Sequence, residues 1–341
     1  MAAMTTRLAM TTRTKVLVPA IAAALLLLAV ACTPPTQDGP GVVPQPPARG
    51  KVAGQPSAPS SGCTSPTAPT PPPGRSTVFL PFQGGFRFAF VDMPTTPSIG
   101  PRPLLVSLHP FALGPEQWES YSELAAAAAT RGYVVVTPLG SDPGPRWAVP
   151  GGLVSEADDI GFVSALLDRL EDGTCVDRNR EFAAGFSAGA AMAQALSCTL
   201  PWRIAGVAGS GGTNLTSLCP DAPGTDVLVL HGTADPIAPP TGSTVIFAPP
   251  LGLPVTDVVA TDAARAGCDP APVTSQPFPS VTQQTYVGCT EGRRVEYRSM
   301  IGAGHTWAGT SNVILELVGG PTNQDFSATD AVLDFFDAHA V

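Results

Sequence analysis

Short apolar segments alternate along the chain with longer amphipathic or alanine-rich segments. The apolar segments predict strands, at residues 86–91, 103–109, 133–137, 180–184, 204–208, 226–230 and 295–300. The longer segments predict helices, at residues 116–129, 156–170, 188–200, 255–265 and 325–338. Strands separated by helices of this length form βαβ units, so we expect one α/β domain with a mostly parallel, doubly wound sheet and helices on both faces.

Residues 1–31 predict an export signal. Arg7, Arg13 and Lys15 precede an apolar run at 16–30 that is too short to span a bilayer comfortably. The run ends in Leu28-Ala29-Val30-Ala31-Cys32, which is similar to a bacterial lipobox, so cleavage before Cys32 leaves a lipid-modified N-terminus. The alternative is ordinary secretion, which the same small residues also suit.

The segment at 32–75 predicts an extended tether. Residues 33–75 contain 13 Pro and few large apolar side chains, so this segment cannot bury enough surface to offset its ordering entropy. The catalytic domain is then expected at 76–341. Met4 and Met10 each begin the sequence Met-Thr-Thr-Arg, and either is an alternative start.

The charge balance disfavours nucleic acid as a partner. Removing residues 1–31 takes away three of the 18 basic residues and none of the 27 acidic ones, which leaves a net charge of −12. Lys51 is then the single lysine. Because phosphate neutralisation dominates nucleic-acid affinity, we expect a neutral substrate, and membrane contact only through the N-terminal lipid.

Candidate chemistry begins at Gly185-Phe186-Ser187-Ala188-Gly189, between a predicted strand and a predicted helix. Two glycines let the backbone turn sharply and expose the serine hydroxyl above the sheet, as in a nucleophile elbow. A serine hydroxyl is a weak nucleophile that needs a base and a carboxylate to orient that base. We therefore expect Ser187 to be the nucleophile of a catalytic triad.

Asp235 and His305 are the expected acid and base. Asp235 follows the strand at 226–230, and His305 lies on a loop after the strand at 295–300. The carboxyl ends of parallel strands carry the active site in such sheets, and both residues lie there.

The competing residues lie elsewhere. The triad is expected in the chain order serine, acid, histidine. Of the other histidines, His109 and His231 come too early for this order, and His339 lies in the last predicted helix. Asp257 and Asp262 are competing acids, but both fall within the helix predicted at 255–265.

An oxyanion hole needs two backbone N–H groups, which we expect from Ala188 and Phe111. Pro110, between His109 and Phe111, has no N–H and cannot donate. Trp147 and Trp307 lie on loops at the same side of the sheet and are interpreted as walls of the substrate pocket; ordinary packing is the alternative.

Six cysteines follow Cys32, and an even number in an exported chain predicts disulfides. Cys268 and Cys289 flank a Pro-rich excursion, and Cys198 and Cys219 enclose the strand after the helix that follows Ser187, so each couple is expected to pair. Cys63 then pairs with Cys175. The sequence holds no Cys-x-x-Cys or His-x-x-x-His, which argues against zinc, and no metal site is expected.

These motifs together resemble the secreted esterases grouped as poly(3-hydroxybutyrate) depolymerases and feruloyl esterases, which have the α/β-hydrolase fold. The resemblance runs from about residue 87 to 307 and is carried by Leu104-Leu105-Val106-Ser107-Leu108-His109, Asp158-Asp159-Ile160-Gly161-Phe162-Val163, Cys175-Val176-Asp177-Arg178-Asn179-Arg180, Gly185-Phe186-Ser187-Ala188-Gly189, His231-Gly232-Thr233-Ala234-Asp235 and Gly304-His305-Thr306-Trp307. Two departures are Pro110 and Ala308-Gly309, where the family usually has Pro-Gly.

The resemblance implies hydrolysis of extracellular polyesters or aryl esters without a cofactor. Three functions are therefore considered: a serine esterase acting on a polyhydroxyalkanoate-type or feruloyl ester, an inactive envelope lipoprotein with the same fold, and a peptidase on that fold. Pro110 is the one feature that favours the inactive protein. The esterase is the leading hypothesis, in an extracellular or envelope location.

Overall fold

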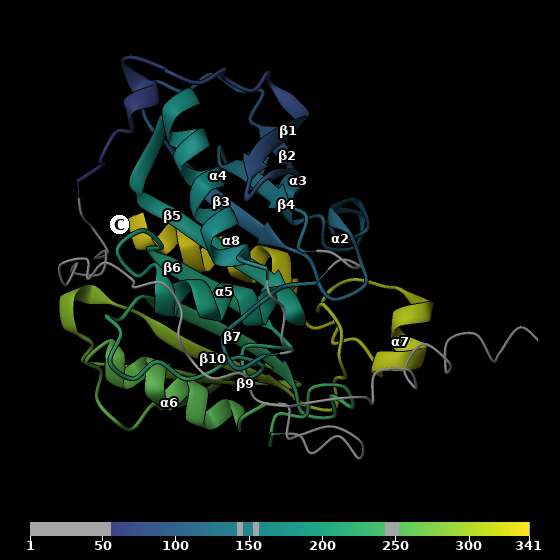
Figure 1. The fold of residues 1–341 in the computed structure, drawn as a ribbon. Coiled ribbons are helices and arrows are strands. Elements are labelled where there is room, and N and C mark those ends of the chain that lie inside the picture. The colour runs from purple at the N-terminus through teal and green to yellow at the C-terminus, as the bar shows by residue number, and fades with distance from the viewer. Residues whose placement is uncertain (1–55, 142–145, 153–156, 243–251, 341) are drawn as a thin grey trace, which may run out of the picture.

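The computed structural model of the protein describes residues 56–141, 146–152, 157–242 and 252–340. A ten-stranded sheet lies at the centre of these residues, and helices cover both of its faces (Figure 1). The strands are β1 (Gly74–Phe82), β2 (Gly85–Met93), β3 (Arg102–Leu108), β4 (Val134–Pro138), β5 (Val176–Phe186), β6 (Gly206–Ser210), β7 (Asp226–Gly232), β8 (Val273–Phe278), β9 (Val281–Tyr286) and β10 (Val295–Met300). The α-helices are α2 (Pro115–Ser122), α3 (Leu124–Thr130), α4 (Asp159–Gly173), α5 (Ala188–Thr199), α6 (Val255–Arg265), α7 (Val313–Gly319) and α8 (Ala328–Asp337), with short 3-10 turns η1 (Ser61–Cys63), η2 (Thr290–Gly292) and η3 (Ala338–Ala340).

The strand order is β1-β2-β4-β3-β5-β6-β7-β10-β9-β8. The six strands from β4 to β10 in this order run parallel, whereas β1 and β2 at one edge and β9 and β8 at the other are antiparallel. The predicted α/β-hydrolase fold, with a mostly parallel sheet, is confirmed. Because β7 and β10 are parallel neighbours, the loops that follow them leave the same edge of the sheet side by side.

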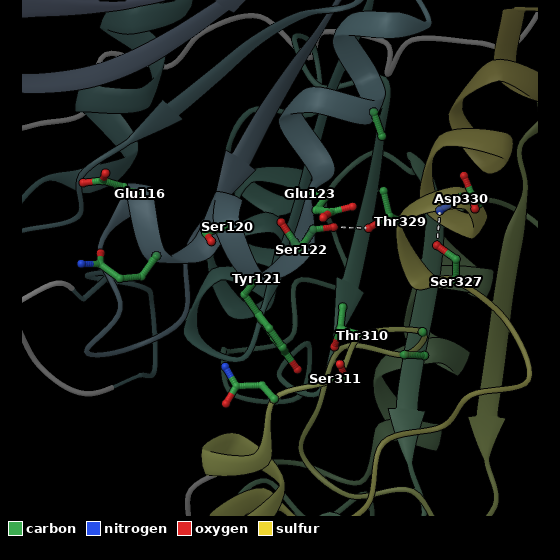
Figure 2. Close-up of a pocket in the computed structure, with 15 residues that line it drawn as sticks. Glu116, Ser120, Tyr121, Ser122, Glu123, Thr310, Ser311, Ser327, Thr329 and Asp330 are labelled. Carbon is green, nitrogen blue, oxygen red and sulfur yellow. Dashed lines mark hydrogen bonds between the residues drawn. The ribbon is translucent and has the colours of Figure 1, made fainter.

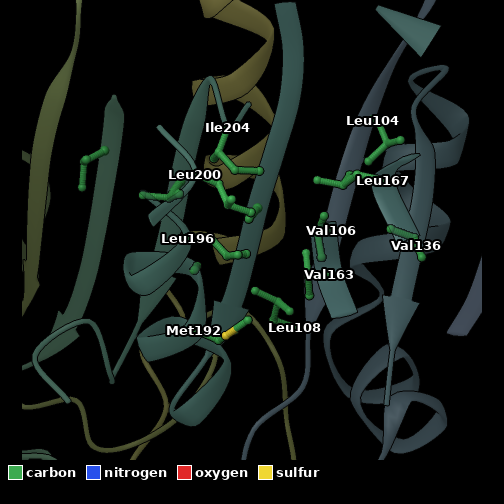
Figure 3. Close-up of a cluster of buried hydrophobic side chains, with 14 of the residues drawn as sticks. Leu104, Val106, Leu108, Val136, Val163, Leu167, Met192, Leu196, Leu200 and Ile204 are labelled. Carbon is green, nitrogen blue, oxygen red and sulfur yellow. The ribbon is translucent and has the colours of Figure 1, made fainter. Parts of the chain in front are cut away.

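Alternate residues of each central strand pack into two apolar layers, one on each face of the sheet. Leu104, Val106 and Leu108 of β3 contact the layer built with α4, α5 and α6, which Figure 3 shows in part. Leu105 of the same strand points to the opposite layer, built with α2, α3 and α8. The two-residue period of a strand therefore supplies both layers from one apolar segment.

The helix predicted at 116–129 is wrong as a single helix, because α2 ends and α3 begins at Glu123. Glu123 adopts a left-handed conformation with a φ of 55°. The fully buried Glu119 carboxylate accepts hydrogen bonds from Ser107 Oγ at 2.6 Å and Thr137 Oγ1 at 2.8 Å in neighbouring strands, and from Ala125 N in the first turn of α3 at 2.7 Å. This side-chain cap supports a second helix start that the alanine-rich pattern conceals.

The described end of the predicted tether lies against the catalytic domain. Pro59 pairs with Asp177 as an antiparallel bridge, and Ser60 donates from Oγ to Thr174 O at 2.7 Å. Part of the segment predicted as a tether, 32–75, therefore contacts the domain predicted at 76–341, and β1 begins within that segment at Gly74. Residues 1–55, with the predicted signal and Cys32, lie outside the described residues.

Three disulfides join the cysteines that the sequence analysis paired. They link Cys63 to Cys175, Cys198 to Cys219, and Cys268 to Cys289. The first ties the N-terminal segment to the start of β5, and the last encloses the β8–β9 hairpin, whose polar strands the sequence did not predict. Within the described parts of the chain, no helix has both the length and the apolar character needed to cross a bilayer.

Candidate active site

Ser187 occupies a strained turn between β5 and α5. Its φ of 54° and ψ of −119° are uncommon for a residue with a side chain, and such strain persists only where the surroundings impose it. Its N–H donates to Ser210 O at the end of β6, at 2.9 Å, while its carbonyl accepts the N–H of Ala191 in the first turn of α5. The half-buried side chain is thereby directed away from the sheet, as expected for a nucleophile elbow.

Both glycines that flank Ser187 are required by close backbone contacts. A Cβ on Gly189 would lie 2.0 Å from Leu108 O, and a Cβ on Gly185 would lie 2.6 Å from the same oxygen. The N-terminus of α5 therefore lies directly against the end of β3. This contact brings the N–H of Ala188 beside the loop that begins at His109.

Asp235 and His305 form a direct pair. His305 Nδ1 lies 2.7 Å from Asp235 Oδ2, so a proton on Nδ1 is donated to the carboxylate. The N–H groups of Ile237 and Ala238 both donate to Asp235 Oδ1 at 2.8 Å, which fixes the carboxylate. His305 is only 7% exposed, and Nε2 is the ring nitrogen left to accept a proton.

The His305 loop and the Ser187 turn meet at Gly211-Gly212. A Cβ on Gly212 would lie 2.0 Å from Ser187 O, and a Cβ on Gly211 would lie 3.2 Å from His305 Nδ1. Gly211 also has a φ of 63°, which favours glycine. The sequence analysis missed this turn, although Ser210-Gly211-Gly212 directly after a strand is a signal for it.

His231 is buried beneath the acid. Its Nε2–H donates to Ala238 O at 2.7 Å, and the same nitrogen lies 3.5 Å from Asp235 Oδ2. Burial lowers the pKa of His231 below its ordinary value, which keeps the ring neutral. It supports the Asp235 loop, and it is not a second base.

His109 supports the loop of the predicted oxyanion donor. Nδ1–H donates to Pro110 O at 2.9 Å, and Nε2 accepts the N–H of Gly140 at 2.9 Å. Burial lowers the pKa of His109 to about 4, so the ring is neutral at pH 7. Phe111, the next residue after Pro110, has a side chain that is 55% exposed.

The structure buries both Trp147 and Trp307, in agreement with ordinary packing, the alternative to a role as pocket walls. Trp147 donates from Nε1 to His109 O at 2.8 Å and its ring lies 4.7 Å from the His109 ring. Trp307 donates from Nε1 to Thr329 Oγ1 at 2.9 Å and meets Trp118 edge-on at 5.1 Å. Trp147 thereby fixes the loop that begins at His109, and Trp307 fixes the His305 loop against α8.

A polar cavity of about 960 Å³ lies beside the His305 loop (Figure 2). Tyr121 connects the two, since its hydroxyl accepts the N–H of Trp307 at 2.9 Å. The described lining is rich in hydroxyl and carboxylate groups, which include Glu116, Ser120, Tyr121, Glu123, Thr310, Ser311, Thr329 and Asp330. Ser187, Asp235 and His305 are not among these described lining residues, whereas Ala308 and Gly309 are, so the cavity lies beside the loop that follows His305.

Sequence comparisons find esterases. A profile of the Phospholipase/Carboxylesterase family matches residues 158–244, which contain Ser187 and Asp235. NocK of Nocardia uniformis subsp. tsuyamanensis, named as a candidate esterase, is 28% identical over 338 residues, which cover 92% of this chain and 96% of NocK. Feruloyl esterase B of Piromyces equi is 31% identical over 217 residues, which cover 60% of this chain and 39% of that enzyme.

A solved structure supports the same fold. The acetyl xylan esterase from Aspergillus awamori matches with a TM-score of 0.51 at 15% identity, over 68% of this chain and 94% of that one. At this identity the likeness shows the fold alone.

Proposed function

We propose that the chain is a carboxylesterase with an α/β-hydrolase fold, which hydrolyses neutral carboxylic esters through a triad of Ser187, His305 and Asp235. The observation that carries the proposal is the 2.7 Å contact between His305 Nδ1 and Asp235 Oδ2, on a loop that meets the strained turn of Ser187. A carboxylate at Nδ1 sets the tautomer in which Nε2 is a base.

The proposed reaction has two steps. The Ser187 oxygen forms a bond to the acyl carbon as its proton moves to His305 Nε2, and His305 then gives that proton to the departing alcohol as the ester C–O bond breaks. In the second step His305 takes a proton from water, the resulting hydroxide attacks the acyl-enzyme, and the proton returns to the Ser187 oxygen as the acid leaves.

The negative charge of each tetrahedral intermediate needs donors. We assign these to the N–H groups of Ala188 and Phe111. Ala188 is the first residue of α5, whose N–H has no acceptor within the helix and lies at the positive end of its dipole. Pro110 removes one N–H from the other loop, but the fixed His109 ring supports the position of the next donor.

The substrate is proposed to be a neutral ester with an apolar or aromatic acyl group, of the polyhydroxyalkanoate or feruloyl type. The described lining of the polar cavity holds the carboxylates of Glu116, Glu123 and Asp330 and no Lys or Arg, which disfavours an anionic substrate there. The test compares kcat/KM for 3-hydroxybutyrate oligomers, methyl ferulate, an acetylated xylo-oligosaccharide and a succinyl ester. Preference for the succinyl ester would contradict the proposal.

Ser187→Ala tests the nucleophile. We expect hydrolysis of a short-chain p-nitrophenyl ester to fall by about 10³ or more, because attack, acylation and turnover all need the hydroxyl. Ser197→Ala, in the last turn of the helix α5 that follows Ser187, is the matched control and should keep near-normal activity. Equal activity in the two variants would show that Ser187 is not the nucleophile. Hydrolysis of matched amide substrates, measured in parallel, distinguishes an esterase from a peptidase.

Export is proposed from residues 1–31, with lipid attachment at Cys32. The three disulfides support an oxidising location. Detergent-phase partitioning of the full-length protein should be lost on Cys32→Ala. Partitioning that Cys32→Ala leaves unchanged would refute lipid attachment at Cys32, and its absence in both proteins would favour ordinary secretion.

A further inference from the structure

Helix α7 turns its apolar face to solvent. Val313 and Leu317 are 81% and 85% exposed, and Ile314 and Val318 are 74% and 61% exposed. These positions follow the helical repeat of three to four residues, so the four side chains share one face. An apolar face on the outside of a helix has a cost in water and marks a surface that contacts something else.

The structure holds this short helix firmly at both ends. The side chain of Asn312 accepts the N–H groups of Ile314 and Leu315 at 3.1 Å, and Gly320 ends the helix with a φ of 90°. Figure 1 shows α7 standing out from the body of the molecule. A helix of two turns is not stable alone, so these contacts are what present its apolar face.

The same helix is joined directly to the candidate base. The N–H of His305 donates to Gly319 O at 2.6 Å, and a Cβ on Gly304 would lie 1.9 Å from that oxygen. With a rise of about 1.5 Å per residue, the apolar face begins within about 10 Å of His305 along the helix axis. Two other site loops carry exposed apolar side chains as well: Phe111 of the oxyanion loop, and Ile237, which follows Asp235 and is 47% exposed.

We infer that these six side chains form a docking surface for a water-insoluble, neutral ester, an inference that rests on the proposed hydrolysis at Ser187. We call this surface the apolar rim; it consists of Phe111, Ile237, Val313, Ile314, Leu317 and Val318. An ester film or droplet seated on the rim lies against the loops that carry the triad, so its surface carbonyls are supplied to Ser187 without full dissolution of the substrate.

The charge and size of the rim select this occupant over two others. The full sequence carries a formal net charge of −9, and α7 itself has one charged residue, Glu316, so an anionic bilayer is repelled while a neutral ester surface is not. A second copy of the chain needs about 800 Å² from each partner for a stable interface, more than the six partly exposed side chains of the rim provide.

The test uses Ile314→Gln/Leu317→Gln in a Ser187→Ala background, so that adsorption is measured without turnover. Adsorption to a poly(3-hydroxybutyrate) film is compared with that of the Ser187→Ala parent. The matched control is Phe79→Gln/Phe86→Gln, since these side chains are 66% and 76% exposed on the outer strands β1 and β2. Thermal unfolding of all three proteins checks that each is folded.

We expect the α7 variant to need at least about tenfold more protein for half-saturation of the film, about 1.4 kcal/mol, and the control to stay within twofold of the parent. When Ser187 is intact, the same α7 substitutions should lower the ratio of film hydrolysis to soluble-ester hydrolysis by a similar factor. Equal adsorption by the α7 variant and the parent would overturn the inference. So would a parent dimer that the α7 variant dissociates, or α7-dependent binding to phosphatidylglycerol vesicles that exceeds binding to the film.

The inference and the proposed function fail separately. If the protein with Ser187 intact does not hydrolyse a soluble ester, the proposed function is wrong, whereas loss of adsorption in the α7 variant would still support the rim. If soluble hydrolysis depends on Ser187 but the parent does not adsorb to the film, the rim alone is refuted.

Discussion

The neutral His109 ring makes the fold sensitive to acid. Nε2 accepts the N–H of Gly140, so a proton added to Nε2 would face another donor and break that hydrogen bond. Burial lowers the pKa of His109 from 6.5 to about 4, with the nearby Arg87 acting in the same direction and Asp159 and the bond to Pro110 O opposing it. In the unfolded chain His109 is exposed to water, so it binds the proton with its ordinary pKa of 6.5.

The size of the effect follows from linkage. Each unit of pKa difference is worth about 1.4 kcal/mol, so a folded pKa of about 4 against 6.5 contributes about 3 kcal/mol. Because the folded pKa is the lower one, this contribution is present above pH 6.5 and is lost as the pH falls from 6.5 to about 4. The Pro110 turn, and with it the N–H of Phe111, should be disturbed over the same interval.

The assay is urea unfolding of the oxidised protein at pH 7, 5.5 and 4. His109→Gln keeps an amide oxygen to accept the Gly140 N–H but does not titrate, so its unfolding free energy relative to wild type should rise by about 3 kcal/mol between pH 7 and pH 4. Val106→Ala, in the buried strand β3 that directly precedes His109, is the control and should destabilise equally at every pH. A difference between wild type and His109→Gln that does not change with pH would refute the reasoning.

Three further outcomes test the site and its support. Gly189→Ala places a Cβ 2.0 Å from Leu108 O and should cost about 3 kcal/mol in the urea assay and most of the esterase activity; Gly100→Ala, where a Cβ meets nothing within 4 Å, should cost neither, and equal effects would refute the contact. Asp235→Asn should lower kcat by about 10³ to 10⁴ in steady-state assays while leaving stability little changed, and a loss below tenfold would show that another carboxylate orients His305. Cys63→Ser/Cys175→Ser removes the disulfide between residues 112 positions apart and should lower the free energy of unfolding by about 2–4 kcal/mol in the same assay. An unchanged midpoint would show that the N-terminal segment is held by its hydrogen bonds alone.

The sequence predicts the elements that position the candidate triad, because local pattern and strand order are sufficient there. Apolar segments end directly before the loops of Ser187, Asp235 and His305, and parallel strands place those ends at one edge of the sheet. The strand at 295–300 and the helix at 255–265 have the predicted bounds in the structure.

The sequence pattern does not predict features that depend on contacts with other segments of the chain. A loop position shows on which side of the sheet Trp147 and Trp307 lie, but not that each indole N–H finds a buried partner, His109 O and Thr329 Oγ1. The break at Glu123 depends on the capping Glu119 carboxylate, which side chains of β3 and β4, the strands before and after this helical segment, hold in place.

The polar strands β8 and β9 and the outward-facing α7 lack the inward apolar pattern by which strands and helices are recognised. These three elements therefore cannot be predicted from the sequence pattern and are seen only in the structure.

The most direct test of the account is covalent labelling of the oxidised protein with a fluorophosphonate, followed by peptide mass mapping. Only an activated hydroxyl reacts, so we expect one label, on Ser187, and its loss in His305→Ala. Val106→Ala, a core variant with the triad intact, should still be labelled. A label on a different serine, or ester hydrolysis by a protein that leaves Ser187 unlabelled, would contradict the proposal that Ser187, His305 and Asp235 act together.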